Sequence, residues 1–392
     1  MPTTRWKNSL YRLALPFRAP RPDRNPEICV EGHPLSSRDT LERLLRRNHV
    51  LGASVLLSDG SDRSIITCSL KHPVRNVTPS SLFRVASITK MASSLAALIV
   101  LEEKDIPLHS SVNDILGSFG NLGSFPELEG VTVEHLLSHT SGLVDPPGLE
   151  DALLQGLPFP DLLRRCRHGN PGQSFLYSNL GFGLIGCLLE AILQEPVSVI
   201  LDKKVFTPLG MRATLDASTL DPAGIVPISR VLPYDPGKEL LITPLGRKPL
   251  SEPDPLRHYG HTAGSMYVDI LSLERLLRCL MAEGRPLLHS NLGQEMIRVR
   301  AEYGKISPTL SYGLGLLIIR DASLSSGRIL GHQGFAYGCV DGAFWEEETQ
   351  KIVIFLNGGA SEARRGRLGI CNGDILRWAL KKEMPLWSGS VK

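Results

Sequence analysis

Runs of β-branched and apolar residues with the length of strands lie near both ends of this chain, and helical patterns occupy its middle. Residues 52–57 and 63–70 form two such runs, and the polar stretch between them predicts an antiparallel hairpin. Toward the other end, strand-like runs lie at residues 313–320, 328–330, 339–345 and 352–357. Because the connections within each group are too short for crossover helices, the sheet should be mainly antiparallel. The sequence therefore predicts an α+β fold, in which helices flank one sheet built from both ends of the chain.

The spacing of apolar residues indicates where the helices lie. We expect helices at residues 37–47, with Ser37 as the N-cap, and at 88–102, 133–139, 162–167, 181–194, 197–205, 268–282 and 374–382. Between the helix at 88–102 and about residue 250, no convincing strand pairs are expected. The predicted organisation is a poorly ordered N-terminal extension at 1–35, a discontinuous sheet domain at 36–86 and 255–385, and a helical insertion domain at 87–254.

The composition excludes several classes of protein. With 392 residues, 42% of them hydrophobic and 21% charged, the chain can bury a large core. A net charge of +3 is too small to indicate a nucleic-acid partner. Every apolar run is far shorter than the roughly 20 residues of a membrane span, so no integral membrane segment is expected. The sequence leaves the oligomeric state open.

Two features bear on the cellular compartment. The basic N-terminus contains a short apolar patch at 13–17, but Pro16 interrupts it and no small-residue cleavage site follows, so a secretory signal is not indicated. A peripheral membrane arm is the alternative to an unstructured extension. The seven cysteines are odd in number, scattered and without metal-ligand spacing, which favours buried thiols in a reducing compartment. We therefore expect a cytoplasmic protein.

Ser87 and Lys90 form the first candidate catalytic group. Ser87 precedes the helix expected at 88–102 and is a natural N-cap. Three residues further on, a capping box would place Glu or Gln, yet this chain has Lys90. The positive end of the helix dipole disfavours an ammonium ion and lowers its pKa, so the lysine could take a proton from the serine hydroxyl. The alternative is an ordinary N-cap serine followed by a surface lysine.

Two later groups add polar residues that suit the same chemistry. Tyr177 could exchange protons with a serine or a leaving group, and Asn179 could hydrogen-bond a substrate amide; alternatively, Tyr177 only packs and Asn179 caps the next helix. In the segment that begins with His332, Gly334 would let a substrate approach the backbone, and the N–H groups of Phe335 and Ser87 would form an oxyanion hole. The alternative for this segment is a glycine-rich hairpin corner with a surface histidine.

In this order, the three groups resemble the serine β-lactamase and penicillin-binding protein family, most closely its class C and D-Ala-D-Ala carboxypeptidase-like branch. The matching segments are Leu82–Lys90, Val133–Leu143, Phe175–Gly186, Pro208–Met211 and Tyr312–Gly315. The resemblance implies the β-lactamase/transpeptidase-like fold and a serine hydrolase that cleaves a small amide, ester or lactam through an acyl-enzyme. The implied catalytic residues are Ser87, Lys90 and Tyr177, and the implied substrate-binding residues are Asn179, His332, Gly334 and Phe335. No metal or other cofactor is implied.

The third group departs from the pattern of true class C β-lactamases. Their Lys-Thr-Gly, which helps to bind the substrate carboxylate, corresponds here to His332, Gln333 and Gly334. The missing hydroxyl puts efficient β-lactam hydrolysis in doubt, and a histidine with the ordinary pKa of about 6.5 would lose its charge above neutrality. His135 and His139 have a spacing that can hold zinc, but no third ligand follows in the usual pattern, so we expect no metal site. An acyltransferase with the same acyl-enzyme and a catalytically silent scaffold are the alternative functions.

Overall fold

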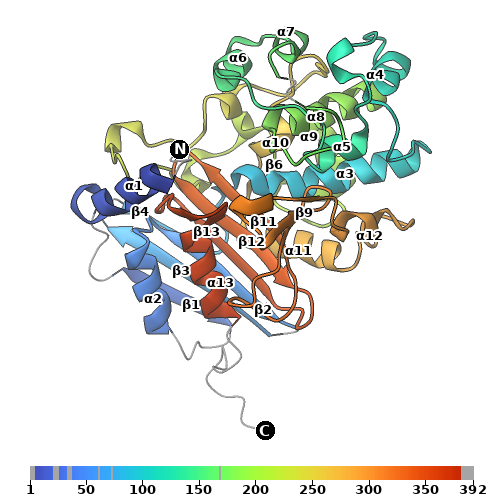
Figure 1. The fold of residues 1–392 in the computed structure, drawn as a ribbon. Helices are drawn as coiled ribbons and strands as arrows, with labels where there is room; N and C mark the ends of the chain where they lie inside the picture. The colour runs from blue at the N-terminus through green and yellow to red at the C-terminus, as the bar shows by residue number, and fades with distance from the viewer. Residues whose placement is uncertain are drawn as a thin grey trace.

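The computed structural model of the protein describes residues 5–20, 26–32, 38–60, 62–71, 74–166 and 169–380. In these residues, a ten-stranded antiparallel sheet lies on one side of the molecule and a group of helices on the other (Figure 1). The strand order is β1-β3-β2-β13-β12-β11-β10-β9-β8, and β4 pairs with β3. The strands are β1 Glu27–Gly32, β2 Ala53–Asp59, β3 Asp62–Lys71, β4 Val74–Arg75, β8 Ala301–Glu302, β9 Leu310–Tyr312, β10 Leu317–Ile319, β11 Ile329–Ala336, β12 Cys339–Glu346 and β13 Ile352–Asn357.

The centre of the sheet joins the two ends of the chain, as the sequence predicted. β2 pairs with β13 from Ala53 opposite Asn357 to Ser58 opposite Ile352. Along β13, Ile352, Ile354 and Leu356 face one buried cluster, while Val353 and Phe355 face another. This period of two shows that both faces of the sheet are covered, which explains the continuous apolar sequence of this strand.

Different helices cover the two faces. α2 (Arg38–Arg47) and α13 (Ile370–Ala379) pack together across one face, which Figure 1 turns toward the viewer, and α11 (Ile270–Met281) packs on the other. The helical part of the fold contains α3 Thr89–Glu103, α4 Val112–Gly120, α5 Val133–Leu137, α6 Leu149–Gln155, α7 Pro160–Leu163, α8 Asn179–Leu193, α9 Val197–Leu201, α10 His261–Gly264 and α12 Leu292–Ile297. A π-helical turn, Asp202–Phe206, continues α9.

Two short sheets lie outside the main one, and the first was not expected. β5 (Phe83–Arg84) and β6 (Ala213–Thr214) both pair with β7 (Tyr267–Val268), and of these three only β6 lies in the region where no strand pairs were predicted. Strands of two residues have no detectable alternation, so only their long-range pairing reveals them. β14 (Arg364–Arg365) and β15 (Leu368–Gly369) form the second.

The expectation of a poorly ordered N-terminal extension is wrong for the described parts of residues 1–35. α1 (Arg5–Arg18) packs Leu15 into the core beside α2 and α13, and Asn8 exchanges hydrogen bonds with the backbone of Arg364. β1 pairs with β3 along all six of its residues. These partners are far away in sequence, so local composition could not show them. Ser37, the predicted N-cap of α2, lies outside the described residues.

Two further expectations concern membranes and thiols. Among the described helices, none alone is long and apolar enough to cross a membrane; only α8 taken together with Val197–Phe206 reaches that length and composition, and the two are bent by 89°. α8 itself is almost wholly buried in the protein. The seven cysteines are unpaired, and all but Cys29 are buried.

Candidate active site

Ser87 lies in a 3-10 turn, Ala86–Ile88, that joins β5 to α3. We expected Ser87 to cap the helix, but α3 begins at Thr89 and its N-cap residue, Ile88, makes no side-chain cap. Ala86 has a φ of +46°, a strained backbone conformation for a residue with a side chain, of the kind that concentrates at functional sites. The hydroxyl of Ser87 is therefore free of a capping role and available to other partners.

Lys90 lies one turn into α3, and its amine points at Ser87. Its side chain is fully buried, and Nζ contacts three oxygens: Oγ of Ser87 at 3.2 Å, Oδ1 of Asn179 at 2.9 Å and the carbonyl oxygen of Ala263 at 2.6 Å. Two of these oxygens can only accept hydrogen bonds, so a neutral amine would give them its two hydrogens. Its lone pair would then face the serine hydroxyl.

The pKa of Lys90 is lowered to about 7. Burial is the largest cause, because it removes water from the charged form; the carboxylate of Asp145 acts in the opposite direction, and the guanidinium of Arg84 lowers the pKa further. The sequence predicted the direction of this shift but attributed it to the helix dipole. The sequence did not show the burial of the amine, which is the largest cause in the structure.

Tyr177 approaches the same serine from the segment before α8. Its hydroxyl donates a hydrogen bond of 2.8 Å to Oγ of Ser87, and burial raises the pKa of its phenol. The ring of His139 packs against the ring of Tyr177 with the centroids 4.2 Å apart, and Nδ1 of His139 accepts a hydrogen bond from the backbone N–H of Ser178. Tyr177 is thus held rigidly in its neutral form.

Asp145 organises the start of α8, and sequence reasoning missed it. Its carboxylate accepts hydrogen bonds from Oγ of Ser178, Nδ2 of Asn179 and the backbone N–H of Leu180, at 2.8–3.1 Å. Ser178, not Asn179, is the N-cap of the helix. Asn179 therefore links Asp145 to Lys90 through its two amide atoms. No pattern in the loop around Asp145 pointed to this role, because its partners lie more than 30 residues away.

Gly334 brings β11 against the turn that carries Ser87. A Cβ atom at this position would lie 2.3 Å from the carbonyl oxygen of Val85, closer than real Cβ atoms come. We expected this glycine to admit a substrate to the backbone, and that interpretation is wrong, because Val85 and Ala86 occupy the adjacent space. Glycine is required here for the approach of two segments of the protein.

The backbone of Phe335 faces the same turn. Its partner across β12 is Val340, whose N–H and C=O both bond to the side chain of Asn357 instead of to β11. In an antiparallel ladder, such a pair is not hydrogen-bonded, so the N–H of Phe335 also points away from β12. β10 pairs with β11 only at its start, which leaves this amide on the edge that packs against the turn of Ser87.

His332 does not line the pocket into which Ser87 opens, contrary to the expectation of a substrate-binding residue. Its Nε2 lies 2.9 Å from the hydroxyl of Tyr312, and its Nδ1 lies 2.7 Å from the carbonyl oxygen of Gln333. Burial lowers its pKa to about 3, so the ring is neutral at working pH and the predicted loss of charge above neutrality is wrong. The amide of Gln333 bonds to the backbone of Arg367 and Gly369.

Ser87 opens into a pocket of about 320 Å³. Asn179, Phe335 and Ser87 line it together, whereas the fully buried Lys90 and the half-buried Tyr177 contact Ser87 without belonging to this lining. Its other lining residues are Arg84, Ala86, Asp145, Leu149, Glu150, Leu153, Arg230, Thr243, Leu245, Tyr259, Gly260, Ala263, Gly264, Ser265, Ala336 and Tyr337. The pocket thus combines an apolar wall with a few charged groups, as small-molecule sites do.

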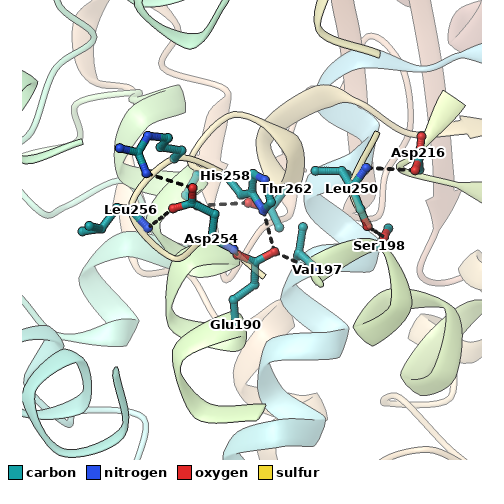
Figure 2. A network of polar contacts seen from close by, with 11 residues as sticks. Glu190, Val197, Ser198, Asp216, Leu250, Asp254, Leu256, His258 and Thr262 are labelled. Carbon is teal, nitrogen blue, oxygen red and sulfur yellow. Dashed lines mark hydrogen bonds and ion pairs between the residues drawn. The ribbon is translucent and has the colours of Figure 1, made fainter. Parts of the chain in front are cut away.

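A buried polar network, which Figure 2 shows, joins α8 to the segment that precedes one wall of this pocket. Glu190 of α8 is fully buried; its carboxylate accepts hydrogen bonds of 2.8 Å from the N–H groups of Val197 and Asp254, and lies 2.7 Å from Nδ1 of His258. A buried carboxylate is stable only when its oxygens are paired in this way. The network holds residues 254–258 on α8.

The pocket wall continues directly from that segment. Tyr259 and Gly260 follow His258 and line the pocket. A Cβ atom on Gly183 of α8 would lie 1.5 Å from the carbonyl oxygen of Tyr259, so glycine allows the two backbones to meet. Glu190 therefore positions part of the pocket without contacting it.

The described residues contain no group of three or more His, Cys, Asp or Glu side chains placed to hold a metal ion. His135 accepts a hydrogen bond from the N–H of Thr132 in a capping box, and His139 packs against Tyr177. The two histidines thus have separate structural partners.

Comparison with known proteins shows which sequences and folds this chain resembles. A sequence model of the Beta-lactamase family matches residues 38–367. Penicillin-binding protein 4* of Bacillus subtilis (strain 168) is 27% identical over 341 residues, which cover 81% of this chain and 70% of that protein. The unguisins hydrolase ungD' of Aspergillus campestris (strain IBT 28561) is 30% identical over 190 residues, or 45% of this chain and only 35% of that hydrolase. The D-stereospecific amidohydrolase from Streptomyces sp. superposes with a TM-score of 0.65 at 22% identity, over 86% of this chain and 96% of that one.

The family match covers most of the chain, so the protein belongs to the Beta-lactamase family. Its fold is the β-lactamase/transpeptidase-like fold that the sequence predicted, and the structural superposition supports the same assignment.

Proposed function

We propose that the protein is a serine hydrolase that cleaves a small amide or ester through an acyl-enzyme on Ser87. One observation carries the proposal: at the pocket, Oγ of Ser87 accepts a hydrogen bond from Tyr177 and contacts the enclosed amine of Lys90. A hydroxyl needs an adjacent base to act as a nucleophile near neutral pH. Membership in the Beta-lactamase family supports the same chemistry.

Lys90 is the proposed base. Its pKa of about 7 makes the neutral amine abundant at working pH, whereas burial disfavours the phenolate of Tyr177. Two groups whose pKa values are displaced in opposite directions suit a base and an acid. Asn179 and the carbonyl of Ala263 would orient the lone pair of Lys90 toward Ser87, and Tyr177 would supply the proton of the leaving group.

The steps follow from these roles. Oγ of Ser87 attacks the substrate carbonyl while its proton passes to Nζ of Lys90, and the N–H groups of Ser87 and Phe335 stabilise the oxyanion. The bond to the leaving group breaks as that group takes the phenolic proton of Tyr177, which the ammonium of Lys90 restores. Water, activated by the same amine, then attacks the ester of Ser87 and releases the acid.

The site favours simple amides and esters over β-lactams. The side chain of Gln333 is engaged with the backbone of Arg367 and Gly369, and the ring of His332 is neutral and buried behind Tyr312. Neither residue can supply the hydroxyl and cation with which class C β-lactamases bind a carboxylate. These two positions therefore cannot hold the carboxylate of a β-lactam where class C enzymes hold it, and we expect slow turnover of β-lactams.

Labelling with a fluorescent fluorophosphonate tests the proposal. Wild-type protein should acquire one adduct that mass mapping places on Ser87, and Ser87→Ala should acquire none and lose at least about a thousandfold in turnover of 4-nitrophenyl esters. An adduct elsewhere, or an active and folded Ser87→Ala, would refute the acyl-serine. Product analysis with added alcohol distinguishes hydrolysis from the alternative, acyl transfer; a folded wild type with neither activity nor label would favour the silent scaffold.

A further inference from the structure

The charged residues that line the pocket differ in whether they already have partners. Its two carboxylates are engaged: Asp145 accepts three hydrogen bonds at the start of α8, and Glu150 accepts one from the hydroxyl of Tyr337. Its two guanidinium groups belong to Arg84, three residues before the proposed nucleophile, and to Arg230 at the exposed rim. Arg230 lies in the electrostatic field of Glu362.

Arg84 is buried without the partners that a buried guanidinium normally has. Only 9% of its surface is exposed, and neither Nε nor Nη1 has a hydrogen-bond partner among the described residues. The ring of Tyr337 packs against the guanidinium with its centroid 5.1 Å from Cζ, which fixes its position but supplies no acceptor. Buried charges are usually paired, so an unpaired one at a pocket points to a missing anion.

Asp341 on β12 is a candidate internal counter-ion, because Arg84 acts on it electrostatically. Oδ1 of Asp341 accepts hydrogen bonds from the backbone and side chain of Asn357, and no ion pair joins it to Arg84. Burial is the largest influence on the pKa of Asp341 and raises it well above its ordinary value, whereas Arg84 lowers it. Asp341 leaves Nε and Nη1 of Arg84 without a hydrogen-bond partner.

We infer that Arg84 is the recognition site for an anionic group on the substrate, most simply a carboxylate. The inference rests on the proposed function, which it narrows to small amides or esters that carry a negative charge a few bonds from the scissile carbonyl. The ring of Tyr337 fixes the plane of the Arg84 guanidinium, whose N–H groups would donate hydrogen bonds to the anion. Arg230 adds a second positive charge at the rim of the pocket. This site is built from β5 and the β11–β12 hairpin, and it does not use the positions of His332 and Gln333.

Matched substrates that differ in one charge test the inference. Mono-4-nitrophenyl adipate and 4-nitrophenyl hexanoate carry the difference on the acyl side; 3-carboxy-4-nitrophenyl butanoate and 4-nitrophenyl butanoate carry it on the leaving group. For each substrate, kcat/KM is divided by the rate constant of its hydrolysis by hydroxide, which corrects for intrinsic reactivity. In at least one pair, we expect this ratio to be about tenfold or more higher for the anionic substrate than for the neutral one. Absence of such a preference in both pairs would overturn the inference.

The variants assign that preference to one side chain. Arg84→Met should reduce the anionic-to-neutral ratio about tenfold or more, Arg84→Lys should reduce it less, and Arg320→Met, which removes an exposed arginine beyond β10, should leave it unchanged. An equal loss for both members of each pair in Arg84→Met would show a structural role only and contradict the inference.

Binding to the inactive variant separates this inference from the proposed function and also serves if Arg84→Met does not fold. By calorimetry, Ser87→Ala should bind monomethyl adipate at least about tenfold more tightly than dimethyl adipate, with an affinity that weakens as salt is added. Equal affinity of Ser87→Ala for the two esters would overturn the inference, even if labelling of Ser87 in the wild type supported the hydrolase. Charge-selective binding by Ser87→Ala, together with a wild type that is not labelled on Ser87, would overturn the hydrolase alone.

Discussion

The hydroxyl of Tyr177 lies 2.8 Å from Oγ of Ser87, although the two residues are 90 positions apart in the sequence. Each belongs to a short segment that leads into a buried helix, α3 for Ser87 and α8 for Tyr177. The packing of these two helices therefore sets the distance between the proposed nucleophile and its proposed proton donor. This explains why many contacts around the site, from Asp145 to Glu190, serve to fix the ends of α8.

The pH dependence of acylation should reveal the titration of Lys90. Because the neutral amine is the proposed base and its pKa is about 7, kcat/KM should rise with pH through about 7 and then level off. Fluorophosphonate labelling rates between pH 5 and 9 measure the same rise in rate, because the fluoride that leaves phosphorus needs no proton from Tyr177. His332, with a pKa of about 3, should contribute no inflection in this range. A rate that falls as pH rises through 7 would contradict the assignment.

Asp145→Asn should move the rise of kcat/KM to lower pH. The carboxylate of Asp145 raises the pKa of Lys90, so its removal lets the amine lose its proton more readily. An asparagine keeps one acceptor oxygen for the start of α8. Asp161→Asn, at an exposed position of α7, is the matched control and should leave the pH of this rise unchanged. A rise of kcat/KM at higher pH in Asp145→Asn would show that the electrostatic argument is wrong.

Tyr177→Phe should harm amide cleavage more than cleavage of activated esters. An amine leaves only after protonation, whereas a nitrophenolate leaves without it, so loss of the phenol should cost about 10²–10⁴ for a 4-nitroanilide or simple amide. For 4-nitrophenyl esters, we expect a loss nearer tenfold. Tyr303→Phe is the control, since its ring packs against Phe175 in the same aromatic cluster. Equal losses for both substrates would place Tyr177 in another role.

Local patterns predicted the parts of this structure that local interactions determine. The hairpin of β2 and β3, the apolar strand β13 and the three-residue spacing of Ser87 and Lys90 are all evident from neighbouring residues. Other features depend on partners far away along the chain: the role of Asp145, the contact of the Ala263 carbonyl with Lys90, and the ordered helix α1. The neighbouring sequence contains no pattern that predicts them. His332 had a position that resembled a binding residue, but only the packing around it shows that the ring is buried.

Gly334→Ala tests the close approach of β11 to the turn of Ser87. The added Cβ would lie 2.3 Å from the carbonyl oxygen of Val85, and neither backbone can move without disturbing its strand or turn. We expect a loss of about 1–3 kcal/mol in the free energy of unfolding, with a fall in kcat because Ser87 and the N–H of Phe335 separate. Gly117→Ala in α4 is the control, since its Cβ would have no heavy atom closer than 3.8 Å. Unchanged unfolding and kcat would contradict the packing argument.

Glu190→Gln should destabilise the fold and loosen the pocket wall at the same time. Three groups bond to the carboxylate of Glu190: the N–H groups of Val197 and Asp254, and Nδ1 of His258. The amide nitrogen of a glutamine cannot accept hydrogen bonds, so at least one of these groups would lose its partner at this fully buried side chain. We expect the free energy of unfolding to fall by about 3 kcal/mol in urea titrations. Glu195→Gln, which breaks an exposed ion pair with Lys203, should cost less than about 1 kcal/mol. Because Tyr259 and Gly260 follow His258 directly, KM should rise more than kcat falls in Glu190→Gln; similar small losses of stability in both variants would show that the network does not support this wall.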